Sequence, residues 1–253
     1  MNDPDVSAVP TSNGLAGRYF NTGFPALKRL AALGLVSALG AASMVVLAGS
    51  VPAMADDAAD DDLRLLALGD SLIAGYGLPP EQGFTAQLES ALRAEGWPVT
   101  VLDGGVSGDT SAGGRARLDW VLADEPDAVL VALGANDGLR GIDPDETRAN
   151  LDAILARLAG DEDLPTLFAG MYAPPNLGRE YEQAFNGLYP DLAATHDVGF
   201  FPFFLKDVAM VEALNQGDGI HPNAEGVAVM VENLLPHVTD LLEQAHGNTS
   251  GDG

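Results

Sequence analysis

Three residue types that together perform acyl transfer occur in this chain. Ser71 follows the apolar run that ends at Gly69, and Asp218 and His221 lie three residues apart, about 150 positions later. A serine hydroxyl becomes a nucleophile when a histidine removes its proton, and an aspartate can hold that histidine in the required tautomer. These residues therefore predict a nucleophile, a general base and an orienting acid, in the order Ser, Asp, His.

Two segments between them offer donors for a developing negative charge. Gly108 and Asn136 each follow a hydrophobic run. The backbone N–H of Gly108 and the side-chain amide of Asn136, with the backbone N–H of Ser71, would form an oxyanion hole. A plain turn glycine and an Asn-Asp turn are the structural alternatives. Asp70 and Asp137 flank these positions, and we interpret both as capping and turn residues without a direct catalytic role.

The same segments resemble the SGNH (GDSL) hydrolase family. The resemblance covers residues 63–243 and implies that Ser71, His221 and Asp218 act as nucleophile, base and orienter. It also implies an oxyanion hole at Ser71, Gly108 and Asn136. The longer strings are similar to the bacterial periplasmic thioesterase I / protease I / lysophospholipase subgroup, which is arylesterase-like. Four blocks carry the match: Gly69-Asp70-Ser71-Leu72, Gly108, Asn136 and Asp218-x-x-His221. Ala135 departs from the family, which often has glycine there.

Residues 1–55 have the pattern of an export signal. Lys28 and Arg29 precede an apolar stretch, and Ala53-Met54-Ala55 has the small-x-small form that a signal peptidase cleaves. We expect cleavage after Ala55, a periplasmic or secreted product, and no stable membrane anchor; an uncleaved anchor is the alternative. The expected divisions are a signal peptide at 1–55, a mobile acidic leader at 56–62, the hydrolase domain at 63–246 and a polar tail at 247–253.

The charge of the chain limits its partners. After Ala55 there remain nine basic and 35 acidic residues, a net charge of −26, with Lys206 as the only lysine. This argues against a nucleic acid or an anionic membrane surface as a partner, because phosphate binding requires a cationic face. Such a surface indicates adaptation to salt, with a generally acidic secreted protein as the alternative. We expect a monomer.

No metal and no cofactor are expected. The chain has no cysteine, which excludes disulfides and thiolate metal sites. Asp70, Asp218 and His221 are metal-ligating types, but no metal-binding motif spans them. The other histidines have no carboxylate motif beside them and are expected at the surface: His196, His237 and His246.

Apolar runs alternate with amphipathic segments along the chain, which predicts βαβ units. We expect a flavodoxin-like three-layer α/β/α sandwich with a five-stranded parallel sheet. The blocks follow the strands, at the sheet edge where such folds bind ligands. The predicted strands are Leu63–Leu68, Val99–Leu102, Ala128–Leu133, Pro165–Met171 and Val198–Phe201. The predicted helices are Glu81–Glu95, Arg115–Ala123, Asp143 or Pro144 to Gly160, Tyr181–His196 and Ala224–Ala245, the last kinked at Pro236.

These features predict a secreted serine hydrolase for small acyl esters or thioesters. In one loop, five apolar or aromatic residues suit the wall of an acyl site: Tyr172, Ala173, Pro174, Pro175 and Leu177. A carbohydrate acetylesterase and a non-catalytic binding protein on the same fold remain alternatives. A glycosidase with paired carboxylates leaves His221 and Asn136 unexplained. The Gly-x-Ser-x-Gly elbow is absent, which argues against an α/β-hydrolase fold.

Overall fold

A five-stranded parallel sheet runs through residues 62–249, the part of the chain that the computed structural model describes. Its order is β2-β1-β3-β4-β5, the flavodoxin-like order, and all neighbouring strands are parallel. The predicted sheet is therefore confirmed. The strands are β1 (Leu63–Gly69), β2 (Val99–Gly105), β3 (Ala128–Ala132), β4 (Thr166–Ala169) and β5 (Gly199–Phe201).

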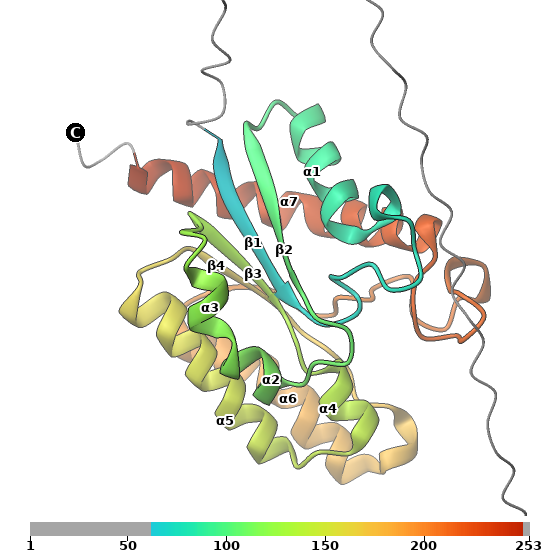
Figure 1. Cartoon of the computed structure of the whole chain (residues 1–253). Helices are drawn as coiled ribbons and strands as arrows, with labels where there is room; N and C mark the ends of the chain where they lie inside the picture. Colours follow the sequence, from blue (N-terminus) through green and yellow to red (C-terminus); the bar gives the residue numbers. More distant parts are fainter. Residues whose placement is uncertain (1–61, 250–253) are drawn as a thin grey trace, which may run out of the picture. The chain divides into compact units, whose positions relative to one another are not determined.

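Helices cover both faces of this sheet and complete the predicted three layers (Figure 1). Helices α1 (Phe84–Ala94) and α7 (Ala224–Thr249) pack together on one face. The other face carries α2 (Ser111–Ala116), α3 (Leu118–Leu122), α5 (Pro144–Leu155) and α6 (Arg179–His196). Short elements complete the description: α4 (Ala135–Arg140), 3₁₀ turns at Pro80–Gln82, Pro175–Leu177 and Glu212–Leu214, and a π-helical turn at Ala156–Asp161.

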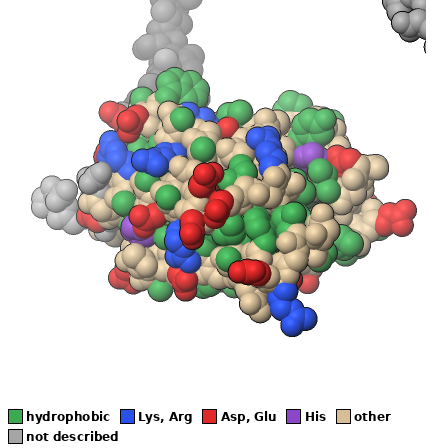
Figure 2. All heavy atoms as spheres, turned by 90° about the horizontal axis from the view of Figure 1, so that it is seen from below, with side chains coloured by type: hydrophobic (Ala, Val, Ile, Leu, Met, Phe, Trp, Pro, Cys, Tyr) green, Lys and Arg blue, Asp and Glu red, His purple; other side chains and the backbone are tan. Residues whose placement is uncertain are grey.

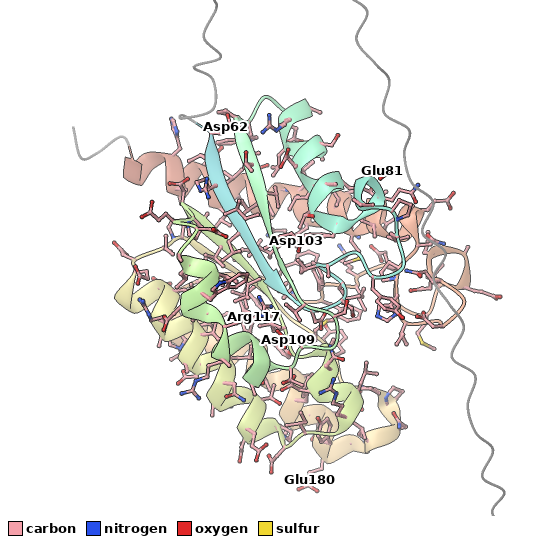
Figure 3. All side chains as sticks on the ribbon, viewed as in Figure 1. Asp62, Glu81, Asp103, Asp109, Arg117 and Glu180 are labelled. Atoms are coloured by element: carbon pink, nitrogen blue, oxygen red, sulfur yellow. The ribbon has the colours of Figure 1, made fainter. Side chains whose placement is uncertain are left out.

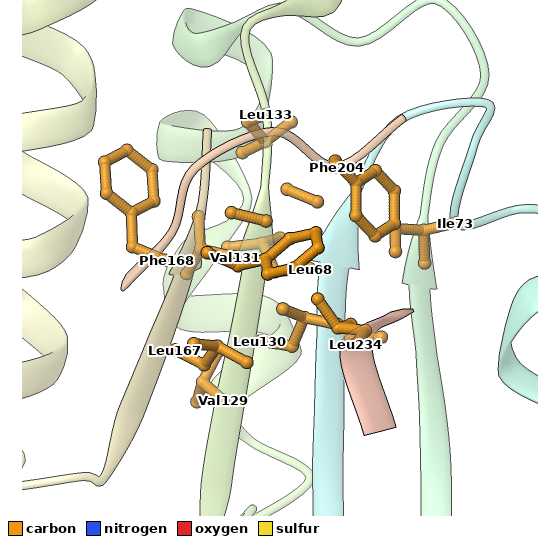
Figure 4. Close-up of a cluster of buried hydrophobic side chains, with 14 of the residues drawn as sticks. Leu68, Ile73, Val129, Leu130, Val131, Leu133, Leu167, Phe168, Phe204 and Leu234 are labelled. Carbon is orange, nitrogen blue, oxygen red and sulfur yellow. The ribbon is translucent and has the colours of Figure 1, made fainter. Parts of the chain in front are cut away.

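The core lies on both sides of the central strands (Figure 4). All five residues of β3 are buried, as expected for a strand covered by helices on both faces. On α1 the buried residues are Phe84, Leu88 and Leu92, the i, i+4, i+8 stripe that the sequence predicts. Full burial of one such side chain stabilises the fold by about 1.5–3 kcal/mol. The sheet edge is therefore carried by strands and helices with a buried core on both faces.

The helix expected at Arg115–Ala123 is wrong in its bounds, because two short helices occupy this region. The first begins at Ser111, where the hydroxyl of Thr110 accepts a hydrogen bond from the Gly113 N–H at 3.3 Å. The break falls at Arg117, whose side chain turns inward to bond Asp109 and the carbonyl of Gly69. Tertiary contacts of one arginine thus override the helical pattern.

The C-terminal helix is longer than expected. It continues through Pro236 and ends at Thr249, so the first part of the segment expected as a polar tail is helical. Within residues 62–249, no helix has the length and apolar character needed to cross a membrane. The expected signal peptide at 1–55, most of the leader at 56–62 and positions 250–253 lie outside the described residues.

The carboxyl ends of the strands share one edge of the sheet. The segments that follow β1, β2 and β3 begin there, and they carry Ser71, Gly108 and Asn136 respectively. The last loop before α7 carries Asp218 and His221. The parallel topology therefore gathers at one edge residues that are far apart in the sequence.

Candidate active site

Ser71 lies in the turn that immediately follows β1. The Asp70 carboxylate accepts the Leu72 N–H at 3.0 Å and closes this turn. Gly69 must be glycine, because a Cβ there would lie 2.2 Å from the Ile73 side chain and 2.8 Å from the carbonyl oxygen of Ala132. This close approach holds the turn against β3 and fixes the position of Ser71.

The loop between Leu214 and Ala224 brings Asp218 and His221 to Ser71. Nε2 of His221 lies 2.9 Å from Oγ of Ser71, and its Nδ1 lies 2.6 Å from Oδ2 of Asp218. The other carboxylate oxygen of Asp218 accepts the backbone N–H groups of Ile220 and His221, both at 3.0 Å. A continuous chain of hydrogen bonds therefore links these three side chains, as the sequence predicts.

The protonation state of this chain follows from Asp218. The hydrogen bond from the His221 side chain, followed by the backbone N–H bonds, lowers the pKa of Asp218 to about 2. The carboxylate is therefore ionised at neutral pH and can only accept hydrogen bonds. Nδ1 of His221 must then carry the proton, so in the neutral ring Nε2 accepts from the Ser71 hydroxyl. A general base requires this arrangement.

Gly108 adopts a backbone conformation that favours glycine. Its φ is +84°, in the left-handed region, although a Cβ there would meet no atom closer than 3.7 Å. The conformation, and not the lack of space, therefore requires glycine. The carbonyl of Gly108 accepts a hydrogen bond from the Arg140 guanidinium at 2.7 Å, which anchors this loop to the end of α4.

Arg117 and Asp109 fix the same loop from the other side. Figure 3 labels both residues near the carboxyl ends of the strands. Nε of Arg117 donates to Asp109 at 2.7 Å, and a second guanidinium nitrogen donates to the Gly69 carbonyl at 2.8 Å. One largely buried arginine thus ties the Gly108 loop to the end of β1, directly before Ser71.

Asn136 lies in the first turn of α4 and donates to Oδ2 of Asp70 at 3.1 Å. Asp70 is fully buried, and this burial raises its pKa to about 6 against the lowering effect of the Leu72 N–H and Asn136. Above that pH the carboxylate only accepts, so it selects the NH₂ end of the Asn136 amide. One N–H is used there, and the second remains for an oxyanion. Asp70 therefore orients Asn136 in addition to forming the expected turn.

Asp137 joins the two segments that carry the candidate oxyanion donors. Its buried carboxylate accepts the backbone N–H of Ser111 at 2.8 Å, the Ser111 hydroxyl, and the Thr147 hydroxyl at 3.2 Å. It thus connects α4, which carries Asn136, to the start of α2 and to α5. We expected Asp137 to act only as a turn residue. Its bond to Ser111 joins positions 26 residues apart, so it cannot be recognised from local sequence.

A cavity of about 570 Å³ opens beside Ser71 and His221. Its lining in the described structure contains no Asp, Glu, Lys or Arg, and apolar residues predominate. Hydrophobic side chains gather near the middle of this face of the molecule (Figure 2). The apolar wall includes Leu139, Tyr172, Pro174, Phe203, Leu205 and Ile220.

Aromatic contacts shape the walls of this cavity. The rings of Tyr172 and Phe203 stack with centroids 4.4 Å apart, and both line the cavity. The ring of Tyr76 lies against the imidazole of His221, with centroids 4.5 Å apart. The loop around Tyr172 was expected to be apolar, whereas the positions of Tyr76 and Phe203 depend on the tertiary fold.

The remaining histidines lie away from the cavity lining that the structure describes. His237 is exposed, and its ring packs edge-on against Phe201. His196 has a carboxylate partner that the sequence pattern does not reveal, because its Nε2 lies 2.8 Å from Oδ1 of Asp152 on the neighbouring helix α5. Within residues 62–249, no three metal-ligating side chains gather in a way that could hold an ion.

The pattern of the GDSL-like Lipase/Acylhydrolase family matches residues 67–229, which contain all the candidate site residues described above. The chain belongs to this family. Its fold and the order of its four blocks agree with the resemblance found in the sequence, which is thereby confirmed.

Two named relatives and one solved structure are similar to this chain over most of their own length. Esterase TesA of Pseudomonas aeruginosa is 42% identical over 179 residues, covering 70% of this chain and 89% of that protein. Thioesterase 1/protease 1/lysophospholipase L1 of Escherichia coli is 41% identical, covering 70% and 84%. The crystal structure of AlinE4, an SGNH-hydrolase family esterase, is 43% identical with a TM-score of 0.61, covering 72% of this chain and 97% of that one.

Replacing Asn136 with alanine should lower kcat by about 10²–10³-fold, the usual effect of losing one oxyanion donor. The free energy of unfolding should also fall by about 1–3 kcal/mol, because Oδ2 of the buried Asp70 carboxylate loses its donor while Oδ1 keeps the Leu72 N–H. Steady-state kinetics on a p-nitrophenyl ester measures the effect, with Asn233→Ala as the matched control, because the Asn233 amide donates only to the Lys206 loop and lies outside the cavity lining. A variant whose KM rises while kcat is unchanged would show that Asn136 binds ground-state substrate.

Proposed function

We propose that this chain hydrolyses neutral acyl esters or thioesters through an acyl-enzyme on Ser71, with His221 as base and Asp218 as orienter. One observation carries the proposal: the hydrogen-bonded chain from Asp218 to Ser71 opens into an apolar cavity of about 570 Å³. Membership of an acylhydrolase family agrees with it. The names of its relatives, an esterase and a thioesterase 1/protease 1/lysophospholipase L1, favour ester and thioester substrates.

The proposed reaction has two halves. Oγ of Ser71 attacks the acyl carbon while Nε2 of His221 takes the hydroxyl proton. The carbonyl oxygen becomes an oxyanion that accepts from the N–H groups of Ser71 and Gly108 and from the Asn136 amide. The bond to the leaving oxygen or sulfur then breaks, and His221 returns the proton to it. Water, deprotonated by His221, then attacks the acyl carbon. The bond from that carbon to Oγ of Ser71 breaks, the acid leaves, and His221 returns its proton to Oγ.

The cavity lining favours an apolar acyl group over a sugar ester. A sugar needs several fixed hydrogen-bonding partners, because burying unpaired hydroxyl groups costs about 1–3 kcal/mol each. The walls instead present Leu139, the Tyr172–Phe203 stack and Leu205. This supports a fatty-acyl hydrolase over the carbohydrate acetylesterase. A non-catalytic binding protein would have no use for an intact Ser-His-Asp chain.

A ladder of p-nitrophenyl esters tests this proposal. We expect kcat/KM to rise from acetate through butyrate to octanoate, since each buried CH₂ adds up to about 0.8 kcal/mol of binding. Preference for acetate, together with release of acetate from acetylated sugars, would favour the carbohydrate acetylesterase. Absence of hydrolysis along the whole ladder and with acyl thioesters would contradict the enzyme proposal.

Export is part of the proposal and concerns residues outside the described structure. The basic pair Lys28-Arg29, the apolar stretch after it and Ala53-Met54-Ala55 support cleavage after Ala55 and a periplasmic or secreted product without a membrane anchor. We also propose that this product is a monomer. N-terminal sequencing of the protein recovered from its producing cells should begin at Asp56. An intact N-terminus in the membrane fraction would instead indicate an anchor.

Stability should rise with salt. Residues after Ala55 carry a net charge of −26, so carboxylates repel one another at low ionic strength. The Debye length falls from about 30 Å at 0.01 M salt to about 3 Å at 1 M, which removes most of this repulsion. Thermal unfolding across sodium chloride concentrations is the measurement. A Tm that stays constant or falls toward molar salt would remove the support for a salt-adapted, halophilic protein.

A further inference from the structure

Gln216 joins the two loops that carry the candidate nucleophile and base. Its side-chain amide donates to the backbone carbonyl of Tyr76 at 2.8 Å and to that of Pro222 at 2.9 Å. Its own backbone N–H donates to the carbonyl of His221 at 2.7 Å. One residue therefore contacts the segment after β1 and both His221 and its neighbour.

Tyr76 extends this connection to Ser71. Its backbone N–H donates to the carbonyl of Ser71 at 3.1 Å, and its ring lies 4.5 Å from the imidazole of His221 between centroids. The path Ser71–Tyr76–Gln216–His221 thus consists of backbone and amide hydrogen bonds. It runs in parallel to the direct contact between Ser71 Oγ and His221 Nε2 at 2.9 Å.

The position requires the chemistry of a glutamine. Each amide hydrogen is used by a carbonyl, so a carboxylate of the same shape would donate to neither and would repel both. The amide also lies directly against the backbone of Gly77, where a Cβ would come 2.3 Å from Oε1 of Gln216. Gly77 has a φ of +76°, which allows the chain to turn here and present the Tyr76 carbonyl.

We propose that Gln216 is a positioning residue, which holds the His221 loop against the Ser71 turn at the distance that proton transfer needs. The inference rests on the function proposed above. Gln216 does not belong to the cavity lining in the described structure, so it acts on the reaction through His221 and not by touching substrate. A displacement of about 1 Å between reacting groups costs up to about 10²-fold in rate.

The test is Gln216→Glu with Gln87→Glu as its matched control. The Gln87 amide also donates to two backbone carbonyls, of Gln82 at 2.8 Å and Ala224 at 3.1 Å, but it lies away from the cavity. Each variant loses two hydrogen bonds from a side-chain amide to backbone carbonyls, and each gains one negative charge. We expect Gln216→Glu to lower kcat by about 10–10²-fold with KM unchanged, and Gln87→Glu to keep both values.

A second readout separates positioning from general loosening. The His221–Asp218 bond lies within one loop, so the downfield Nδ1–H proton resonance of His221 should persist in Gln216→Glu while kcat falls. If this variant does not fold, Gln216→Met, which is uncharged and of similar length, takes its place with the same expectation and with Gln87→Met as control.

Three outcomes would overturn the inference: wild-type kcat in the Gln216 variant, a rise in KM alone, or equal losses in the Gln216 and Gln87 variants. The wild-type protein is assayed beside them. If it shows no turnover of any ester or thioester, the proposed function fails and the positioning role fails with it. If it turns over normally and the Gln216 variant matches it, only the positioning role fails.

Discussion

Replacing Ser71 with alanine should lower ester hydrolysis by up to about 10⁶-fold, the scale on which loss of a catalytic serine acts. The hydroxyl is the only group proposed to form the acyl-enzyme, and the oxyanion donors cannot replace it. Folding should be unaffected, since the Ser71 side chain donates only to His221 among the hydrogen bonds described. Initial rates on a p-nitrophenyl ester and a thermal unfolding curve measure both quantities.

The matched control for this variant is Ser90→Ala, on the exposed side of α1. It should keep wild-type rates and thus exclude an effect of expression or handling. Near wild-type hydrolysis by purified Ser71→Ala protein would show that another group is the nucleophile, and the proposed mechanism would then be wrong.

Asp218→Asn should lower kcat by about 10⁴-fold, as loss of the orienting carboxylate does in serine hydrolases with this arrangement. An asparagine amide can donate to Nδ1 of His221, which moves the ring proton to Nε2. That nitrogen can then no longer accept the Ser71 proton. The pair lies 2.6 Å apart, so the new amide replaces the carboxylate without a change of shape.

The pH dependence follows from the lowered pKa of Asp218, about 2 against an ordinary 3.8. A depressed pKa means that the ionised form is favoured in the folded protein. The ionised Asp218 carboxylate therefore adds to the free energy of unfolding above pH 3.8, and this contribution is lost as the pH falls toward 2. Asp218 therefore remains ionised through the neutral range, and the deficit of Asp218→Asn should be constant there.

Asp191→Asn is the control for Asp218→Asn, since Asp191 is an exposed partner of Arg148 and such pairs contribute little. Its rates should match the wild type. A loss of less than tenfold in Asp218→Asn, or a deficit that disappears as the pH rises through neutrality, would contradict the assignment of Asp218 as the orienter.

The sequence predicts the sheet and the position of the site because both depend on local patterns. The apolar runs at β1 and β3 are strands buried on both faces, and parallel strands must end at one edge. The segments that follow β1, β2 and β3 carry Ser71, Gly108 and Asn136. That these residues lie at one edge can therefore be predicted without knowledge of tertiary contacts. Asp218 and His221 are three residues apart, and their contact is likewise local.

The parts that the sequence does not predict depend on contacts between distant segments. The bond from Asn136 to Asp70 spans 66 residues, and the bond from Gln216 to Tyr76 spans 140. Neither has a periodic or spacing signal. The short helix α4 has no apolar stripe from which its position could be predicted. The predicted helix is interrupted at Arg117, because the largely buried guanidinium of this residue forms an ion pair with Asp109. Sequence patterns therefore place the site, while tertiary contacts set its geometry.

Covalent trapping tests the central claim most directly. A fluorophosphonate reacts when a serine oxygen attacks phosphorus and fluoride leaves, with the proton passing to the base. Mass spectrometry of the intact wild-type protein should show one phosphonyl group, and peptide mapping should place it on Ser71. His221→Ala should react far more slowly, because Ser71 then has no base. A fully active enzyme that remains unlabelled, or that carries the label on a residue other than Ser71, would contradict the account.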